Sequence, residues 1–280
     1  MASVSQTTSF EANGGRIGER FARLRADGAR ALITYLTAGY PRPADTGALL
    51  DAVADGGADV IELGVPFSDP LADGPTIQRA SQRALESGVT LAWTLEQLSA
   101  FRARSATPVV LFTYLNPVLG YGVDRFLRDA RDAGADGVLL TDLPVGSDAA
   151  LEEAFEGSPL ALVRLIAPTT PPDRAARIAS RAQGFLYYIS RTGVTGATRT
   201  LRSEIGREVE ALRAHARAPI AVGFGISTPD QAAEVARAAD GVVVGSALID
   251  ALDRGGAADL VALVRSLAAA VHRVDDPVAG

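Results

Sequence analysis

The sequence predicts an α/β fold, a (β/α)8 TIM barrel with an additional N-terminal helix. Eight short apolar runs alternate with segments of amphipathic helical spacing, a pattern typical of parallel strands joined by helices. A short Ala-Asp motif also recurs where a helix ends and a strand begins, at 57–60, 134–137 and 238–241. Because right-handed crossovers place all βα loops on one face, eight such units favour a closed barrel. A doubly wound open sheet is the alternative. It would not explain a shared role for the glycine-rich sequences that follow the last two strands.

The N-terminal helix is expected over residues 15–28, where Ile17, Phe21 and Leu24 recur at helical spacing with arginines between them. We expect this helix to plug the floor of the barrel. The eight strands are expected near 31–37, 59–64, 108–114, 137–141, 160–166, 184–189, 219–223 and 241–244. One barrel domain would then cover 15–273, with a flexible extension at 1–14 and a flexible tail at 274–280.

The overall composition indicates a single domain that does not bind nucleic acid. A length of 280 residues fits one large barrel without a second domain. The net charge of −6 and the pI of about 5.1 make small molecules or proteins the expected partners. Residues 1–14 lack the features of a signal peptide, and no uncharged apolar run approaches the ~18 residues of a membrane helix. We therefore expect a cytoplasmic protein.

Two residue types are missing, and their absence excludes several kinds of chemistry. Cysteine is absent and all 27 basic residues are arginines, so thiolate nucleophiles, cysteine-bound metals and lysine Schiff bases are impossible in this chain. Covalent attachment of pyridoxal phosphate is excluded for the same reason. His215 and His272 fall in helical segments and are expected to be structural or solvent-facing. With no metal expected, acid–base chemistry is left to carboxylates and tyrosines.

Residues 61–75 place two carboxylates on a buried strand and on the loop that follows it. Glu62 belongs to the apolar strand, whereas Asp73 precedes a helix expected to begin near Pro75. The structural alternatives are that Glu62 satisfies backbone N–H groups and that Asp73 caps the helix. The loop is rich in proline and apolar residues, which is unusual for a plain surface connection and favours a lid that carries a catalytic acid.

Glycine-rich sequences follow the seventh and eighth strands, where barrels commonly bind phosphate through backbone N–H groups. The candidate phosphate-binding residues are Gly223, Gly225, Gly245 and Ser246, although each glycine pair is also compatible with a simple tight turn. Residues 190–198 follow the sixth strand and contain few large apolar side chains. This segment is interpreted as a second lid, with a solvated linker as the alternative.

A flat apolar slot is predicted between the acids and the phosphate site. Its candidate walls lie at strand ends or in loops on the same face of the barrel: Tyr35, Ile77, Phe112, Leu139 and Phe224. Tyr187 in the sixth strand could also line the barrel mouth, with its hydroxyl near a polar partner. Ordinary core packing is the alternative for each residue. An aromatic phosphate ester fits a slot of this description.

The string ELGVPFSDPLADGP at 62–75 closely resembles the signature of the tryptophan synthase alpha subunit family. The resemblance continues in TAGYP at 37–41, YLNP at 114–117, DLP at 142–144, SRTGVTG at 190–196, GFGIS at 223–227 and GSA at 245–247, and covers about residues 15 to 270. It implies that Thr195 meets the catalytic aspartate, that Gly196 lies near the phosphate, and that Tyr187 lies beside the catalytic glutamate. Phe185 departs from relatives that carry a tyrosine there.

The resemblance implies cleavage of indole-3-glycerol phosphate to indole and glyceraldehyde 3-phosphate, the alpha reaction of tryptophan biosynthesis. It implies no cofactor in this chain, with pyridoxal phosphate only in a beta subunit that completes an alpha2-beta2 heterotetramer. The loop before Asp73 is predicted to dock this partner through Asp69 and Pro70, a charge among apolar residues. The alternatives are a stand-alone indole-releasing lyase, or a catalytically weak partner that activates a pyridoxal-phosphate enzyme.

Overall fold

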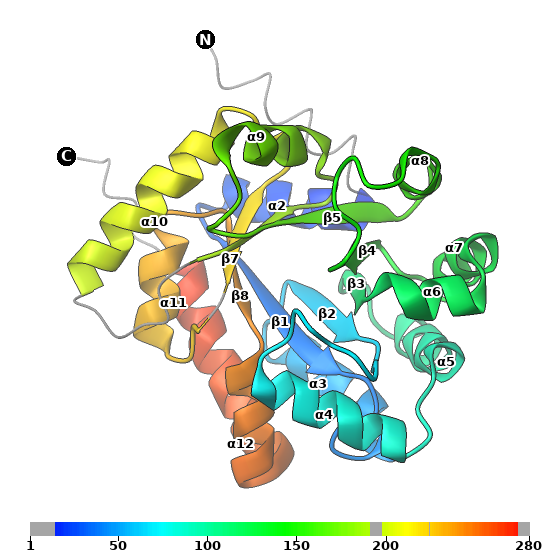
Figure 1. The fold of residues 1–280 in the computed structure, drawn as a ribbon. Coiled ribbons are helices and arrows are strands. Elements are labelled where there is room, and N and C mark those ends of the chain that lie inside the picture. The colour runs from blue at the N-terminus through cyan, green and yellow to red at the C-terminus, as the bar shows by residue number, and fades with distance from the viewer. Residues whose placement is uncertain (1–14, 191–197, 224, 274–280) are drawn as a thin grey trace.

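The computed structural model describes residues 15–190, 198–223 and 225–273, and these form a closed barrel of eight parallel strands (Figure 1). Each strand pairs with its neighbours in sequence, and the eighth pairs with the first, which excludes the doubly wound open sheet. The strands are β1 (Ala31–Thr37), β2 (Val60–Gly64), β3 (Val109–Thr113), β4 (Gly137–Leu140), β5 (Ala161–Ile166), β6 (Leu186–Ile189), β7 (Ile220–Gly223) and β8 (Gly241–Val244). All eight predicted strands are thus confirmed to within two residues at each end.

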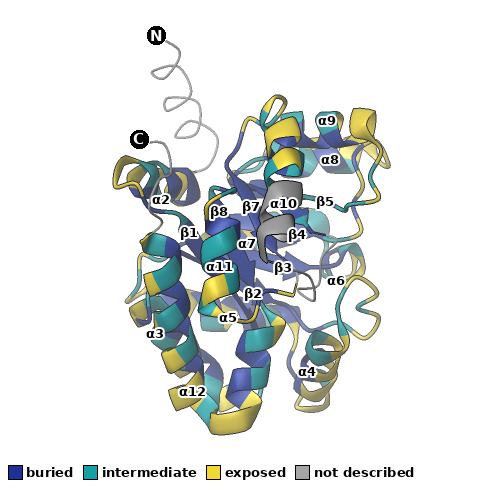
Figure 2. Ribbon diagram, turned by 90° about the vertical axis from the view of Figure 1, so that its left-hand side faces the viewer, coloured by how far each residue is buried: buried dark blue, intermediate teal, exposed yellow. Residues whose placement is uncertain are grey.

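Helices surround the strands, and their inward faces are buried while their outer faces are exposed (Figure 2). They are α2 (Gly15–Ala26), η1 (Pro43–Asp45), α3 (Thr46–Asp55), α4 (Pro75–Glu86), α5 (Leu91–Arg102), α6 (Leu115–Tyr121), α7 (Val123–Asp132), α8 (Ala149–Glu156), α9 (Pro172–Arg181), α10 (Thr198–Arg213), α11 (Pro229–Ala236) and α12 (Ser246–His272). The extensions at 1–14 and 274–280, predicted to be flexible, lie outside the described residues.

Alternate strand residues point to two separate cores. Residues facing outward pack under the helices, and those facing inward fill the barrel interior. Ile17, Phe21 and Leu24 of α2 belong to the interior core, where Phe21 packs against Phe185 with ring centroids 6.1 Å apart. Helix α2 therefore closes the barrel floor as predicted. The same contact places Phe185 at the barrel floor. Its ring packs against the plug helix, at the opposite end of the barrel from the βα loops.

The recurring Ala-Asp motif has a structural role at the floor. Each aspartate accepts a hydrogen bond from a backbone amide of the preceding strand in the barrel: Asp59 from Leu32 (2.7 Å), Asp136 from Val109 (2.8 Å) and Asp240 from Ile220 (2.9 Å). The plug helix pairs an arginine with each of them: Arg20 with Asp59, Arg16 with Asp136 and Arg25 with Asp240. The motif thus joins strand ends and plug helix, which leaves the opposite face of the barrel for chemistry.

Helix α12 is the one helix of the described chain that is long and apolar enough to cross a membrane, with a mean hydropathy of 1.2. Gly255 and Gly256 depart from helical dihedral angles and kink it. Leu248, Leu260 and Leu267 on its inner side are fully buried. We therefore assign α12 to the outer layer of the barrel, where its apolar stripe packs against β1, α3 and α11.

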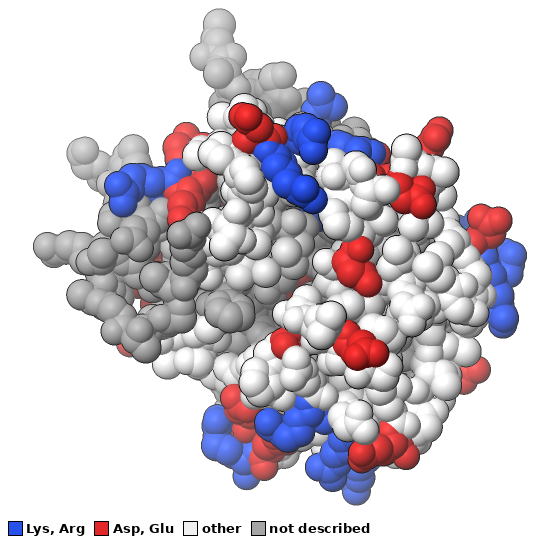
Figure 3. Space-filling model, in the orientation of Figure 1, with Lys and Arg blue, Asp and Glu red and all other residues white. Residues whose placement is uncertain are grey.

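Charged side chains lie mainly toward the edge of the face drawn in Figure 3, where arginines mix with acidic residues. No continuous basic patch crosses the described residues of that face.

Candidate active site

Glu62 projects into the barrel from the middle of β2, beside Tyr35 of β1 and Val110 of β3 in the strand register. Its side chain is 1% exposed, and its Oε1 atom has no hydrogen-bond partner among the described residues. Burial, together with the nearby charge of Asp73, raises the pKa of Glu62 to about 8. A carboxyl group held in this way can lose or take up a proton near neutral pH. Oε1 of Glu62 accepts no hydrogen bond from a backbone N–H group of the described chain, so the structural alternative for Glu62 is not supported at this atom.

Asp73 lies at the end of the loop between β2 and α4, where its Oδ2 accepts a hydrogen bond from the Tyr114 hydroxyl (3.1 Å). The same hydroxyl accepts a hydrogen bond from the backbone N–H of Ala72 (3.0 Å). Helix α4 has Gly74 as its N-cap and no side-chain cap, so Asp73 is not the helix cap. Burial raises the pKa of Asp73 to about 6, against the lowering effect of Tyr114. Asp73 is thus more buried than expected for a residue in a polar lid. A pKa of about 6 still leaves it mostly ionised at pH 7.

Two tyrosines share the interior with Glu62, and a glycine makes room for each. A Cβ on Gly64 would lie 2.1 Å from the Tyr35 hydroxyl, and a Cβ on Gly223 would lie 2.6 Å from the Tyr187 hydroxyl. Burial, followed by the charges of Glu62 and Asp73, raises the pKa of Tyr187 well above its usual value. Both phenols therefore stay protonated beside the acids.

These groups line a cavity of about 450 Å³ at the carboxyl ends of the strands. Of the predicted residues, the cavity wall includes Glu62, Asp73, Tyr187, Tyr35, Ile77, Phe112, Gly225, Gly245 and Ser246. Tyr35 and Phe112 meet edge to face, with ring centroids 5.4 Å apart. The cavity thus joins the two acids, an apolar slot and the glycine-rich ends of β7 and β8.

The glycine-rich end of the cavity presents the start of a helix. Ser246 and Ala247 are the first residues of α12 and line the cavity, and Gly245 precedes them. Backbone N–H groups in the first turn of a helix have no partner within the helix, so they are free to bind an anion. Gly225 lines the same end with a φ of 73°, a conformation that favours glycine.

Two predicted site residues lie elsewhere. Leu139 is fully buried in the barrel interior and does not line the cavity, because β4 reaches the cavity only two residues later, at Thr141. Gly223 is a strand residue whose missing side chain accommodates Tyr187, and it is absent from the cavity wall. The predicted residues Thr195, Gly196 and Phe224 lie outside the described residues, as does most of the second lid.

The sequence interpretation missed several residues of the cavity wall: Thr141, Leu165, Ile189, Ile226, Ser227, Val243, Ala247 and Asp250. Thr141, Leu165, Ile189 and Val243 follow from strand alternation, because each stands two residues beyond an inward-facing neighbour. Ala247 lies in the first turn of α12, and Asp250 follows that turn. No comparable signal in the sequence marks Asp250.

The loop before Asp73 is only partly exposed. Phe67 packs against Tyr114 with ring centroids 5.2 Å apart, and both Phe67 and Pro70 are partly buried. Asp69 is exposed, and Leu71 is 89% exposed. A surface hollow of about 440 Å³ lies between this loop and α4.

Within the described residues, no group of three or more histidine, aspartate or glutamate side chains is placed to hold a metal ion. A closed (β/α)8 barrel whose cavity joins two acids, an apolar slot and the start of a helix is typical of an enzyme of acid–base chemistry on a phosphorylated aromatic substrate. The family model for the tryptophan synthase alpha chain matches residues 21–276. The chain belongs to this family.

Individual relatives agree with this assignment. The tryptophan synthase alpha chain of Geobacter sulfurreducens is 48% identical over 245 residues, which span 88% of this chain and 93% of that protein. The tryptophan synthase alpha chain of Chloroflexus aggregans is 48% identical over 264 residues, which span 92% of this chain and 99% of that protein. The chain is therefore a carbon–carbon lyase that acts on indole-3-glycerol phosphate in tryptophan biosynthesis.

Solved structures resemble the whole barrel. A chain of tryptophan synthase from M. tuberculosis in its open form superposes with a TM-score of 0.84 at 39% identity, covering 92% of this chain and 99% of that one. The alpha subunit from Legionella pneumophila gives a TM-score of 0.83 at 38% identity, covering 91% and 98%.

Proposed function

We propose that Glu62 and Asp73 divide the proton transfers of indole-3-glycerol phosphate cleavage. Breaking the carbon–carbon bond requires a proton on indole C3, stabilisation of a cationic ring nitrogen and removal of a proton from the glycerol hydroxyl. Glu62, with a pKa of about 8, would donate to C3 and then accept the hydroxyl proton. Asp73 would remain ionised and face the indole N–H. The observation that carries the proposal is the partnerless, buried Oε1 of Glu62 in the cavity wall.

The phosphate of the substrate would bind at the opposite end of the cavity. Gly225, Gly245 and Ser246 supply backbone and a helix start there, where the positive end of the α12 dipole favours an anion. The apolar wall between, formed in part by Ile77 and Phe112, would hold the flat indole ring. This orientation aligns the glycerol chain between the ring and the anchor.

The reaction needs no organic cofactor in this chain, and pyridoxal phosphate would belong to a beta subunit. Two solved structures that resemble this chain are described as tryptophan synthase from M. tuberculosis, which supports a partner that completes such an assembly. The exposed residues Asp69 and Leu71, with Pro70 between them, would form part of the docking surface. The cytoplasm is the compartment we propose for this biosynthetic step.

Glu62→Gln tests the central assignment. We expect turnover to fall by at least ~10³-fold while the affinity for glycerol phosphate stays nearly unchanged, because the acid–base group is lost and the phosphate anchor is kept. Steady-state indole release and direct binding measure the two quantities. A folded variant with near-normal turnover would remove Glu62 from the mechanism.

Asp73→Asn tests the second acid in the same assay. The loss should also be severe but can be smaller, since an amide oxygen still accepts a hydrogen bond from the indole N–H. Full activity in a variant that still binds substrate would leave Asp73 with only a structural role.

A further inference from the structure

Thr141 stands at the end of β4 on the inward side of the barrel, two residues beyond Leu139. Its backbone N–H donates to the carbonyl oxygen of Thr113 on β3 (3.1 Å), which fixes the residue against the neighbouring strand. The side chain lines the cavity, and its Oγ1 atom is buried without a hydrogen-bond partner among the described residues.

Four buried side-chain polar atoms of the described residues lack a partner: Thr34 Oγ1, Glu62 Oε1, Thr141 Oγ1 and Arg164 Nε. Only Glu62 and Thr141 belong to residues that line the catalytic cavity. A buried hydroxyl without a partner costs about 1–3 kcal/mol, so proteins rarely keep one without a use. The shared location indicates that Thr141, like Glu62, acquires its partner during the reaction.

Tyr114 supplies the available partner. Its hydroxyl donates to Asp73 Oδ2 (3.1 Å) and accepts from the Ala72 N–H (3.0 Å). A phenol oxygen can accept two hydrogen bonds, so one acceptor position remains. Burial and the charge of Asp73 raise the pKa of Tyr114, and the Thr141 hydroxyl acts in the opposite direction. In the β3–β4 register Thr113 pairs with Leu140, so Tyr114 and Thr141, the next residue of each strand, stand beside each other. The Thr141 hydroxyl nevertheless has no hydrogen-bond partner in the described part of the structure.

We propose that Thr141 is a positioning residue that donates its hydroxyl proton in a hydrogen bond to Tyr114 when substrate is bound. The resulting chain runs from Thr141 to Tyr114 to Asp73, and every hydroxyl in it donates toward the carboxylate. Such a chain polarises each bond and holds the carboxylate ionised and aimed at the ring nitrogen. The inference rests on the role proposed above for Asp73.

Thr141→Val tests the chain, because valine keeps the branched shape and removes the hydroxyl. We expect kcat to fall about 5- to 10-fold with less than about a twofold change in KM, since the hydroxyl matters most when charge develops on the indole nitrogen. The acidic limb of the kcat profile, which reports the enzyme–substrate complex, should move to higher pH, because Asp73 becomes easier to protonate. Thr141→Ser, which keeps the hydroxyl, should recover most of the loss.

Tyr114→Phe provides the matched background. If Thr141 acts through Tyr114, Thr141→Val should cause no further loss in Tyr114→Phe. An equal loss in both backgrounds, a Thr141→Ser variant as poor as Thr141→Val, or a Thr141→Val variant with the normal kcat and pH profile would each overturn the inference. Thermal unfolding of every variant shows whether it is folded.

Asp73→Asn, assayed in parallel, separates the two proposals. A severe loss in Asp73→Asn together with a normal Thr141→Val variant refutes only the role of Thr141. A fully active Asp73→Asn refutes the proposed function of Asp73 itself, and with it the chain.

Discussion

Glu62 carries its carboxyl group in a place where the ionised form is poorly solvated. The protonated form is favoured in the folded protein, whereas in the unfolded chain the group titrates at an ordinary value. Folding therefore binds a proton at neutral pH. The same property that suits Glu62 for proton transfer reduces the stability of the fold as pH rises.

The pH dependence of stability follows directly. The folded pKa of about 8 is raised, so the contribution of Glu62 is fully favourable below the unfolded value and is lost as pH rises toward 8. Relative to the wild type, Glu62→Gln should gain stability between pH 5 and pH 8, by about 3 kcal/mol. Denaturant unfolding of both proteins at the two pH values measures the difference. A pH-independent difference would show that Glu62 is not titrating in this range.

At the scale of the elements, β7 and β8 end at the glycine-rich part of the cavity, where we propose that phosphate binds, and Gly225 lines this part. Its φ of 73° is strained for any residue with a Cβ. Gly225→Val should raise KM far more than it lowers kcat, because the phosphate is held equally in the ground and transition states.

Steady-state kinetics with indole-3-glycerol phosphate measure both constants. Gly225→Ala serves as the smaller substitution, and thermal unfolding controls for damage to the fold. A variant with unchanged KM, or a phosphate-soaked crystal with density elsewhere on the barrel, would refute the anchor.

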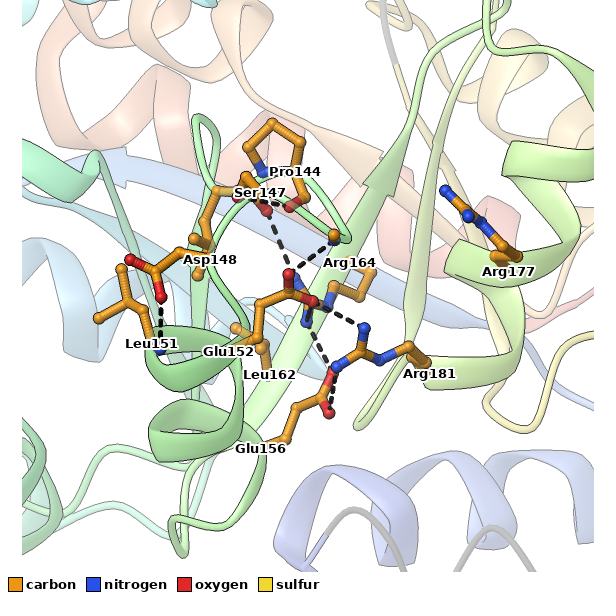
Figure 4. Close-up of polar contacts among 12 residues, drawn as sticks. Pro144, Ser147, Asp148, Leu151, Glu152, Glu156, Leu162, Arg164, Arg177 and Arg181 are labelled. Atoms are coloured by element: carbon orange, nitrogen blue, oxygen red, sulfur yellow. Dashed lines mark hydrogen bonds and ion pairs between the residues drawn. The ribbon is translucent and has the colours of Figure 1, made fainter.

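A network of ion pairs on the outer side of β5 connects this strand to α8 and α9 (Figure 4). Arg164 is 4% exposed and pairs with Glu152 (3.2 Å) and Glu156 (2.7 Å), and Arg181 of α9 pairs with the same two acids. Glu152 also accepts a hydrogen bond from the Gly146 N–H (2.6 Å), which holds the loop after β4. Removing Arg164 would leave the two acids to share Arg181 alone, so the buried network would carry excess negative charge.

Arg164→Met should therefore destabilise the protein by about 3–5 kcal/mol. The matched control is Arg131→Met, which breaks an exposed pair with Asp132 and should change stability by less than about 1 kcal/mol. Denaturant unfolding compares the two. Similar small effects in both variants would show that the buried network adds little to stability.

At the scale of the whole molecule, one loop joins the outer surface to the active site. Asp69 and Leu71 are exposed on it, while Asp73 at its end reaches the cavity and is held by Tyr114. A partner that orders the loop would also position the catalytic carboxylate. Activation by a beta subunit would then be a shift in population toward the closed loop.

Asp69→Ala should weaken activation by a beta subunit while leaving the basal rate largely intact, because Asp69 does not line the catalytic cavity. Indole release with and without the partner, for both proteins, measures the effect. Equal activation of wild type and variant would exclude Asp69 from the coupling. A wild type that no cognate beta subunit activates would favour the stand-alone lyase, and negligible cleavage even with the partner would favour a purely activating role.

The sequence by itself determined the barrel and its plug helix, and it predicted Glu62 and Asp73 as the two catalytic acids. Strand spans follow from apolar periodicity, and the Ala-Asp motif marks where a helix ends and a strand begins. The extended match around Glu62 and Asp73 was specific enough to name the reaction. These features depend on residues close together in the chain, so local pattern is sufficient to find them.

Only the tertiary structure decided how deep each strand reaches and which hydroxyls meet. Alternation shows that Leu139 and Thr141 both face inward, but the relative stagger of neighbouring strands sets which of them reaches the cavity. The Tyr114 bond to Asp73 joins residues 41 positions apart, and the burial that raises the pKa of Glu62 comes from several strands at once. Such properties arise from packing between distant segments, which no local pattern in the chain records.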